Sequence, residues 1–107
     1  MRYKTMRLIC FFDLPVETAK ERKDYRIFRK SLIQEGFIMI QYSVYMRTCP
    51  NRDYVSRVSK RIEQFAPSQG HIRLVMITEK QYTDMKIVIG RKSNTESVLG
   101  SERFIIL

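Results

Sequence analysis

MRLICFFDLP, residues 6–15, is the stretch on which the interpretation of the whole chain depends. It is apolar almost throughout and then meets an acid, Asp13, which is followed by Leu14 and Pro15. Apolar side chains occupy both odd and even positions, so residues 5–13 predict a strand that is buried on both faces and lies centrally in a sheet. The acid at the exit of such a strand needs an explanation.

The segment after Pro15 predicts a helix that ends at Gly36. Thr18 is a suitable N-cap, and Glu21 three residues later would complete a capping box. A helical wheel places a narrow apolar face opposite a basic one. The apolar face holds Tyr25, Phe28 and Leu32, and the basic face holds Arg22, Lys23, Arg26, Arg29 and Lys30.

Three further elements follow. The sequence FIMIQYSVYM at 37–46 is rich in β-branched and aromatic residues and predicts two short strands broken near Gln41. Asn51 is a suitable cap for a second helix, whose apolar residues recur every three or four positions until Pro67. HIRLVMIT at 71–78 alternates as a strand does.

Beyond residue 80 the pattern is weaker. EKQYTDM forms a short link, and the segments KIVIG at 86–90 and RFIIL at 103–107 predict one or two additional strands. The polar stretch between these two segments predicts a loop.

The order strand, helix, two strands, helix, strand predicts an α+β fold, the ferredoxin-like βαββαβ sandwich. In it, both helices cover one face of an antiparallel sheet. We expect one domain over residues 1–107, with its core at about 5–80. The opposite sheet face is left open although the strands place apolar residues on it, so we predict a homodimer.

The net charge favours polyanionic partners. Twenty Lys and Arg face eleven Asp and Glu, which gives a formal charge of +9. Such a balance is typical of proteins that neutralise phosphates, so nucleic acid is the first candidate partner. A membrane surface is disfavoured because there is no lipidation signal and no basic amphipathic helix with large exposed apolar residues.

The location expected from the sequence is the cytoplasm. The apolar run near the start is too short for a membrane span and lacks the small-residue cleavage pattern of a secretion signal. Cys10 and Cys49 are too few and too far apart for a zinc site or a disulfide framework. Two reduced thiols in a cytoplasmic protein is the simpler interpretation.

Asp13 allows two interpretations. It can shape an Asx-type turn before Leu14 and Pro15, or it can be a ligand for Mg²⁺, which prefers hard oxygen atoms. A two-fold axis would bring two Asp13 side chains together, and carboxylates about 4 Å apart repel by roughly 4 kcal/mol at an effective dielectric of 20. A divalent cation or a shared proton would relieve that repulsion.

The basic residues also allow two interpretations, since a charged helix face often does no more than contact solvent. Ion pairs with Glu17, Glu21, Asp24 and Glu35 would offset part of the charge. Few acids adjoin the arginines on the wheel, so we favour phosphate contact. The predicted nucleic-acid-binding residues are Arg22, Lys23, Arg26, Arg29, Lys30, Lys60, Arg61, Arg91 and Lys92.

The single histidine, His71, has no second histidine or nucleophile near it in the sequence. A catalytic triad or zinc site therefore cannot be argued, and a residue at a strand edge is the simpler interpretation. Glycine loops that cradle nucleotide phosphates are absent from the sequence.

The motifs together resemble a known family. The strand ending in FFDLP, the helix ERKDYRIFRKSLIQEGF, the following QYSVY and the strand leading into TEKQ are similar to the small CRISPR-associated spacer-acquisition proteins called "Cas two". The likeness is to members that accompany single-protein-effector (type II) systems. It covers the chain through about residue 90.

The resemblance implies a ferredoxin-like homodimer that lies between two dimers of the CRISPR integrase and binds captured duplex DNA across its middle. It implies that Asp13 binds Mg²⁺ at the dimer interface and carries endonuclease activity on RNA or DNA. It also implies that the segment at about 81–107 holds the integrase, which suits strands with open edges.

Three functions are therefore open. The first is a bridging subunit of the CRISPR adaptation complex, which would contact phosphates with little sequence preference. The second is a Mg²⁺-dependent endonuclease that requires Asp13. The third is a toxin-like ribonuclease or RNA-binding regulator on the same fold, which would prefer RNA to duplex DNA.

Overall fold

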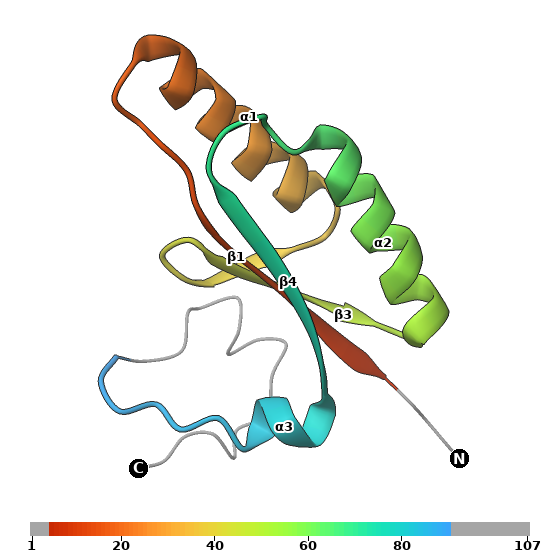
Figure 1. The fold of residues 1–107 in the computed structure, drawn as a ribbon. Helices are drawn as coiled ribbons and strands as arrows, with labels where there is room; N and C mark the ends of the chain where they lie inside the picture. The colour runs from red at the N-terminus through yellow and green to blue at the C-terminus, as the bar shows by residue number, and fades with distance from the viewer. Residues whose placement is uncertain (1–4, 91–107) are drawn as a thin grey trace.

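The computed structural model describes residues 5–90, which form one antiparallel sheet with helices packed on it. The elements are β1 (Met6–Asp13), α1 (Ala19–Gln34), β2 (Ile38–Gln41), β3 (Val44–Cys49), α2 (Arg52–Phe65), β4 (His71–Thr78) and α3 (Glu79–Thr83). The strand order is β2-β3-β1-β4. Figure 1 shows α1 and α2 on the same side of this sheet. The predicted ferredoxin-like α+β fold is confirmed.

β1 lies between β3 and β4 and pairs antiparallel with both, as expected for a strand that is apolar on both faces. Its even-numbered residues Met6, Leu8, Cys10 and Phe12 pack into the main core beneath α1 and α2. Its odd-numbered residues lie on the opposite face, which we call the open face.

Local capping signals set the ends of α1 and α2. The Thr18 side chain accepts a hydrogen bond from the Glu21 amide, and the Glu21 carboxylate accepts one from the Thr18 amide, which is the predicted capping box. The Asn51 side chain accepts from the Tyr54 amide and starts α2. These caps hold amides that a helix start would otherwise leave unpaired.

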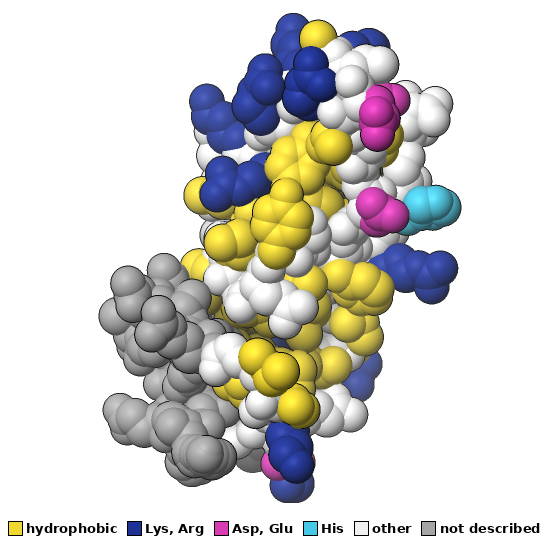
Figure 2. Space-filling model, turned by 90° about the vertical axis from the view of Figure 1, so that its left-hand side faces the viewer, with side chains coloured by type: hydrophobic (Ala, Val, Ile, Leu, Met, Phe, Trp, Pro, Cys, Tyr) yellow, Lys and Arg dark blue, Asp and Glu magenta, His cyan; other side chains and the backbone are white. Residues whose placement is uncertain are grey.

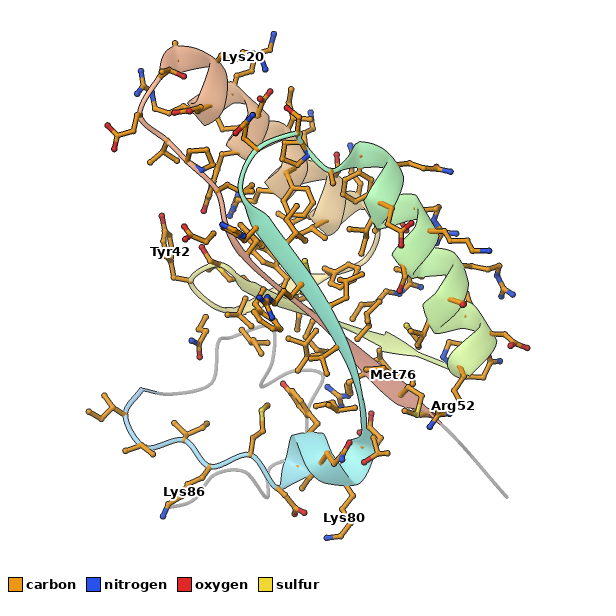
Figure 3. All side chains as sticks on the ribbon, viewed as in Figure 1. Lys20, Tyr42, Arg52, Met76, Lys80 and Lys86 are labelled. Atoms are coloured by element: carbon orange, nitrogen blue, oxygen red, sulfur yellow. The ribbon has the colours of Figure 1, made fainter. Side chains whose placement is uncertain are left out.

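β2 and β3 form the two short strands predicted over 37–46. The turn between them contains Tyr42 and Ser43, and Ser43 has a φ of 63°, which is uncommon for a residue other than glycine. The Phe12 amide donates a hydrogen bond of 3.1 Å to the Ser43 carbonyl. The turn is thereby tied to the end of β1, and Tyr42 stands out from its tip (Figure 3).

The open face is covered in part by α3, a five-residue helix that the sequence pattern did not indicate. Tyr82 of α3 packs with Ile9 and Met46 in a second, smaller core. The Arg7 guanidinium lies 4.2 Å from the Tyr82 ring centroid, and its Nε donates to a Glu79 carboxylate oxygen at 2.6 Å. A cation on the sheet thus holds both ends of α3.

One predicted strand is absent. Residues 86–90 continue without a strand, so that prediction is wrong for the described chain. Val, Ile and their like favour strands, but a strand also needs a hydrogen-bonded neighbour. Here the chain leaves the sheet through α3, and Val88 and Ile89 are exposed. The predicted strand at 103–107 lies outside the described residues.

Within residues 5–90, helices of the length and apolar character needed to cross a bilayer do not occur.

Candidate nucleic-acid and metal site

Asp13 is the last residue of β1 and lies on the open face. Its side chain is exposed, and it makes no hydrogen bond or ion pair with another residue in the 5–90 range. A carboxylate that merely shaped a turn would be bonded to a nearby amide. The exposed oxygens of Asp13 are instead available to a ligand from outside the chain.

His71 lies directly opposite Asp13 on the neighbouring strand. The two are register partners at the exit of β1 and the start of β4. Directly opposed residues of an antiparallel pair lie on the same face with their Cβ atoms about 4.5–5.5 Å apart. The sequence predicts that His71 lies at a strand edge, but it gives no sign that His71 neighbours Asp13.

Arg73 is a second residue that the sequence did not single out. It follows His71 by two positions, so it also lies on the open face, and it is exposed. Its register partner is Phe11. The alternation of apolar and polar residues over 71–78 is visible in the sequence, but the sequence does not reveal that this strand pairs with β1.

Gly70 fixes how closely these two strand ends approach. It has a φ of +104°, and a Cβ atom built on it would lie 2.9 Å from the Asp13 carbonyl oxygen and 2.6 Å from Leu14 Cδ2. Real Cβ atoms do not approach backbone so closely, so glycine is required. The turn before β4 is therefore pressed against the residue that carries the candidate site.

A metal ion would need more ligands than one chain supplies. Groups of three or more His, Cys, Asp or Glu side chains able to hold a metal do not occur among residues 5–90. Asp13 supplies the hard oxygen atoms that Mg²⁺ prefers and leaves them exposed. The residues fit a cation site if a second copy of the chain contributes the same groups across the open face.

The basic face of α1 is placed as predicted. Phe28 and Leu32 are fully buried beneath the helix. Lys23, Arg26, Arg29 and Lys30 are exposed on its outer side, where nitrogen-tipped side chains project into solvent (Figure 3).

Arg22 differs from the other cations of α1. Its guanidinium donates hydrogen bonds of 3.1 Å to the Val16 carbonyl and 3.0 Å to the Glu17 carbonyl. It therefore closes the loop between β1 and α1 while remaining exposed.

On α2, the two predicted residues also differ. Lys60 is exposed. Arg61 pairs with Glu35 at 2.9 Å, and this hydrogen-bonded contact raises the pKa of Arg61. Arg61 thus joins the end of α1 to α2, and its charge is partly offset. Arg91 and Lys92 lie outside the described residues.

The open face has an apolar surface beside Asp13. Phe11 is 38% exposed and Val75 is 41% exposed, and they belong to the neighbouring strands β1 and β4. Figure 2 shows hydrophobic side chains along this side of the molecule, with basic side chains at the upper left. At the right edge, the single histidine lies against an acidic side chain.

Comparisons with known proteins find relatives over most of the chain. The model of the family described as "CRISPR associated protein Cas2" matches residues 6–85. A "CRISPR-associated endoribonuclease Cas2" from Ligilactobacillus salivarius is 56% identical over 95% of this chain and 100% of the relative. A protein of the same description from Treponema denticola is 45% identical over 95% of this chain and 100% of its own length.

A solved structure described as "Crystal structure of cas2" superposes with a TM-score of 0.52 at 14% identity. The match covers 85% of this chain and 93% of the other. At that identity the likeness supports the fold alone.

Proposed function

This chain belongs to the CRISPR-associated Cas2 family, and on that premise we propose that it is a nucleic-acid-binding subunit of the CRISPR adaptation complex. Two copies would pair through their open faces, hold captured duplex DNA and bridge two integrase dimers. The observation that carries the proposal is the exposed basic outer side of α1 on a chain of net charge +9. Contacts of lysine and arginine with phosphate need no particular base sequence.

The salt dependence of DNA affinity tests the binding role. If about six phosphates are neutralised, the logarithm of the affinity for duplex DNA should fall against the logarithm of salt concentration with a slope of roughly −5. Substituting Arg26→Ala and Arg29→Ala together removes four positive charges from the pair of chains and should make this slope roughly three to four units shallower. An affinity that does not respond to salt would exclude this mode of binding.

A matched control is available at the other end of the molecule. Lys80 and Lys86 lie far from α1 near the chain's exit from the sheet (Figure 3), and both are exposed. The Lys80→Ala and Lys86→Ala double variant removes the same charge. It should leave the slope nearly unchanged if α1 is the main DNA contact.

Pairing through the open face is the second part of the proposal. Phe11 and Val75 present apolar area there that a single chain leaves in contact with water, and burying such area drives association. We expect a dimer in sedimentation at micromolar concentration and a monomer after Phe11→Arg. A wild-type monomer at that concentration would contradict the pairing.

A second candidate function is metal-dependent cleavage of RNA or DNA. It is favoured by the unpaired, exposed carboxylate of Asp13 and by the relatives' description as endoribonucleases. Asp13 from each copy would hold Mg²⁺, which when bound polarises a phosphodiester or activates a water. The Gly70 contact would fix the Asp13 backbone.

The Asp13→Asn variant tests this chemistry. Asparagine has nearly the same shape but no charge, so Mg²⁺-dependent cleavage should fall at least a hundredfold while DNA affinity changes little. Cleavage that survives the substitution would place the activity elsewhere. Spacer integration with a purified integrase then separates the two roles, because bridging requires Arg26 and Arg29 but not Asp13.

A further inference from the structure

We propose that His71 is a protein ligand at the Asp13 site and gives that site a preference for Mn²⁺ over Mg²⁺. The inference rests on the proposed metal site and goes beyond it by adding a nitrogen donor. His71 is the only histidine of the chain, so its contribution can be isolated by substitution.

The backbone places the imidazole next to the carboxylate. Asp13 and His71 are directly opposed on adjacent antiparallel strands. Their side chains therefore leave the sheet on the same face, close enough for both to reach one ion. Both are exposed, and Figure 2 shows the histidine against an acidic side chain.

The same arrangement is held by a second, independent contact. Gly70 immediately precedes His71, and its backbone packs so tightly on Asp13 that a Cβ atom would lie 2.9 Å from the Asp13 carbonyl oxygen. The end of β1 and the start of β4 are thereby held together by their strand pairing and by this backbone contact. A site that needs two donors at a constant separation requires this kind of rigidity.

His71 has no structural task that would explain its position. Its side chain makes no hydrogen bond, ion pair or ring contact with another residue in the 5–90 range. Packing does not need it either, because β4 packs against the main core through its even-numbered residues Ile72, Leu74 and Met76. An imidazole at this exposed place contributes little to the fold and remains free to bind.

The donor set decides which ion is preferred. Two copies facing each other would supply two carboxylates and two imidazoles. Mg²⁺ favours oxygen donors and keeps much of its water shell, whereas imidazole suits transition metals. Among divalent ions that support phosphodiester cleavage, Mn²⁺ accepts both carboxylate oxygen and imidazole nitrogen as donors. A site with Asp13 alone would not distinguish the two ions in this way.

The test measures ion binding directly, by the electron paramagnetic resonance signal of free Mn²⁺ and by competition with Mg²⁺. Wild-type protein is compared with His71→Gln, with Asp13→Asn and with Arg73→Gln, a control on the same face two residues away. We expect His71→Gln to weaken Mn²⁺ binding about tenfold and Mg²⁺ binding less than twofold. Arg73→Gln should not weaken either ion.

The ratio of the Mn²⁺ affinity to the Mg²⁺ affinity distinguishes the loss of a ligand from a loss of pairing between copies. Any loss of pairing between copies lowers the binding of both ions on the same protein and leaves their ratio unchanged. A second variant, His71→Glu, replaces nitrogen with oxygen and should move the ratio toward Mg²⁺. An unchanged ratio in both histidine variants would overturn the inference.

The Asp13→Asn variant separates this inference from the metal site itself. If it abolishes Mn²⁺ binding while the histidine variants keep the wild-type ratio, the metal site stands and the His71 ligand does not. If wild-type protein binds neither ion at millimolar concentration, the metal site and the inference fail together.

Discussion

The two faces of β1 show how one strand serves two purposes. On the helix-covered face, Leu8 and Cys10 are at most 1% exposed and pack beneath α1 and α2. On the open face, Phe11 is 38% exposed and Asp13 stands free at the strand's end. Successive residues near the end of β1 thus alternate between the buried core and an exposed apolar surface.

The difference indicates which face stabilises the fold of one chain and which face stays largely exposed in it. The covered face gains its free energy within one chain, from aromatic and aliphatic side chains that exclude water. The open face carries apolar area, a carboxylate and a histidine that stay exposed in the single chain. Substitutions on the two faces should therefore differ in kind as well as in size.

The largest effect on stability is expected on the covered face. Phe28 is fully buried. Its ring centroid lies 5.1 Å from that of Phe12, in an edge-on arrangement, and 5.6 Å from that of Phe65. Phe28→Ala should lower the free energy of unfolding by about 3–5 kcal/mol because it leaves a large cavity. Urea denaturation, followed by circular dichroism, measures the change.

Val75→Ala is the matched change on the open face. Val75 is 41% exposed, so its loss should cost less than about 1 kcal/mol when the protein is dilute enough to be a monomer. It should instead weaken pairing between copies in sedimentation. Equal losses of stability for the two variants would show that the open face is as much a part of the monomer core as the covered face.

The covered face could be predicted largely from the sequence because its signals are local. The capping box of Thr18 and Glu21, the break after Gln41 and the spacing of apolar residues in α2 each fix an element by nearby residues. The prediction was wrong for the segment whose structure depends on pairing with another strand. The β-branched run at 86–90 has strand propensity, but it is not paired in the described chain.

The candidate site could be predicted only in part for the same reason. Asp13 was visible as an acid at the end of an apolar strand. Its closeness to His71 follows from the pairing of β1 with β4 and from their register, which no local pattern encodes. The pairing of Arg61 with Glu35 likewise depends on how α1 and α2 pack.

An effect smaller than that of Phe28→Ala is expected at the junction of the two faces, where Gly70 meets Asp13. Gly70→Ala should cost about 2–3 kcal/mol, since it adds backbone strain at positive φ and a contact with the Asp13 carbonyl. It should also weaken ion binding at Asp13, because the strand end must move. Thermal unfolding and Mn²⁺ titration measure the two effects.

Gly36→Ala provides the matched control for that change. Gly36 has a similar φ of +93°, but a Cβ atom there would meet only the Arg47 side chain at ordinary contact distances of 3.5 Å and more. It should cost about 1 kcal/mol and leave ion binding unchanged. If both glycine variants bind Mn²⁺ alike, the close approach at Gly70 does not position Asp13.

The last comparison of the two faces uses the reactivity of thiols, and it is expected to change stability least. Burial raises the pKa of the Cys10 thiol to about 12. A folded-state pKa above the unfolded one contributes stability that is present below pH 9 and lost as the pH rises toward 12. Thiol reagents attack the thiolate, so at pH 8 native Cys10 should not react.

Phe11→Cys places a thiol one residue away on the open face. We expect it to react with a thiol reagent at least about a hundred times faster than Cys10 at pH 8, since an exposed thiol keeps a pKa near 8.5. Peptide mass analysis after labelling assigns the modified residue. Comparable labelling of Cys10 in the folded protein would mean that the helix-covered face opens on the timescale of the reaction, and that the contrast between the two faces of β1 is one of degree.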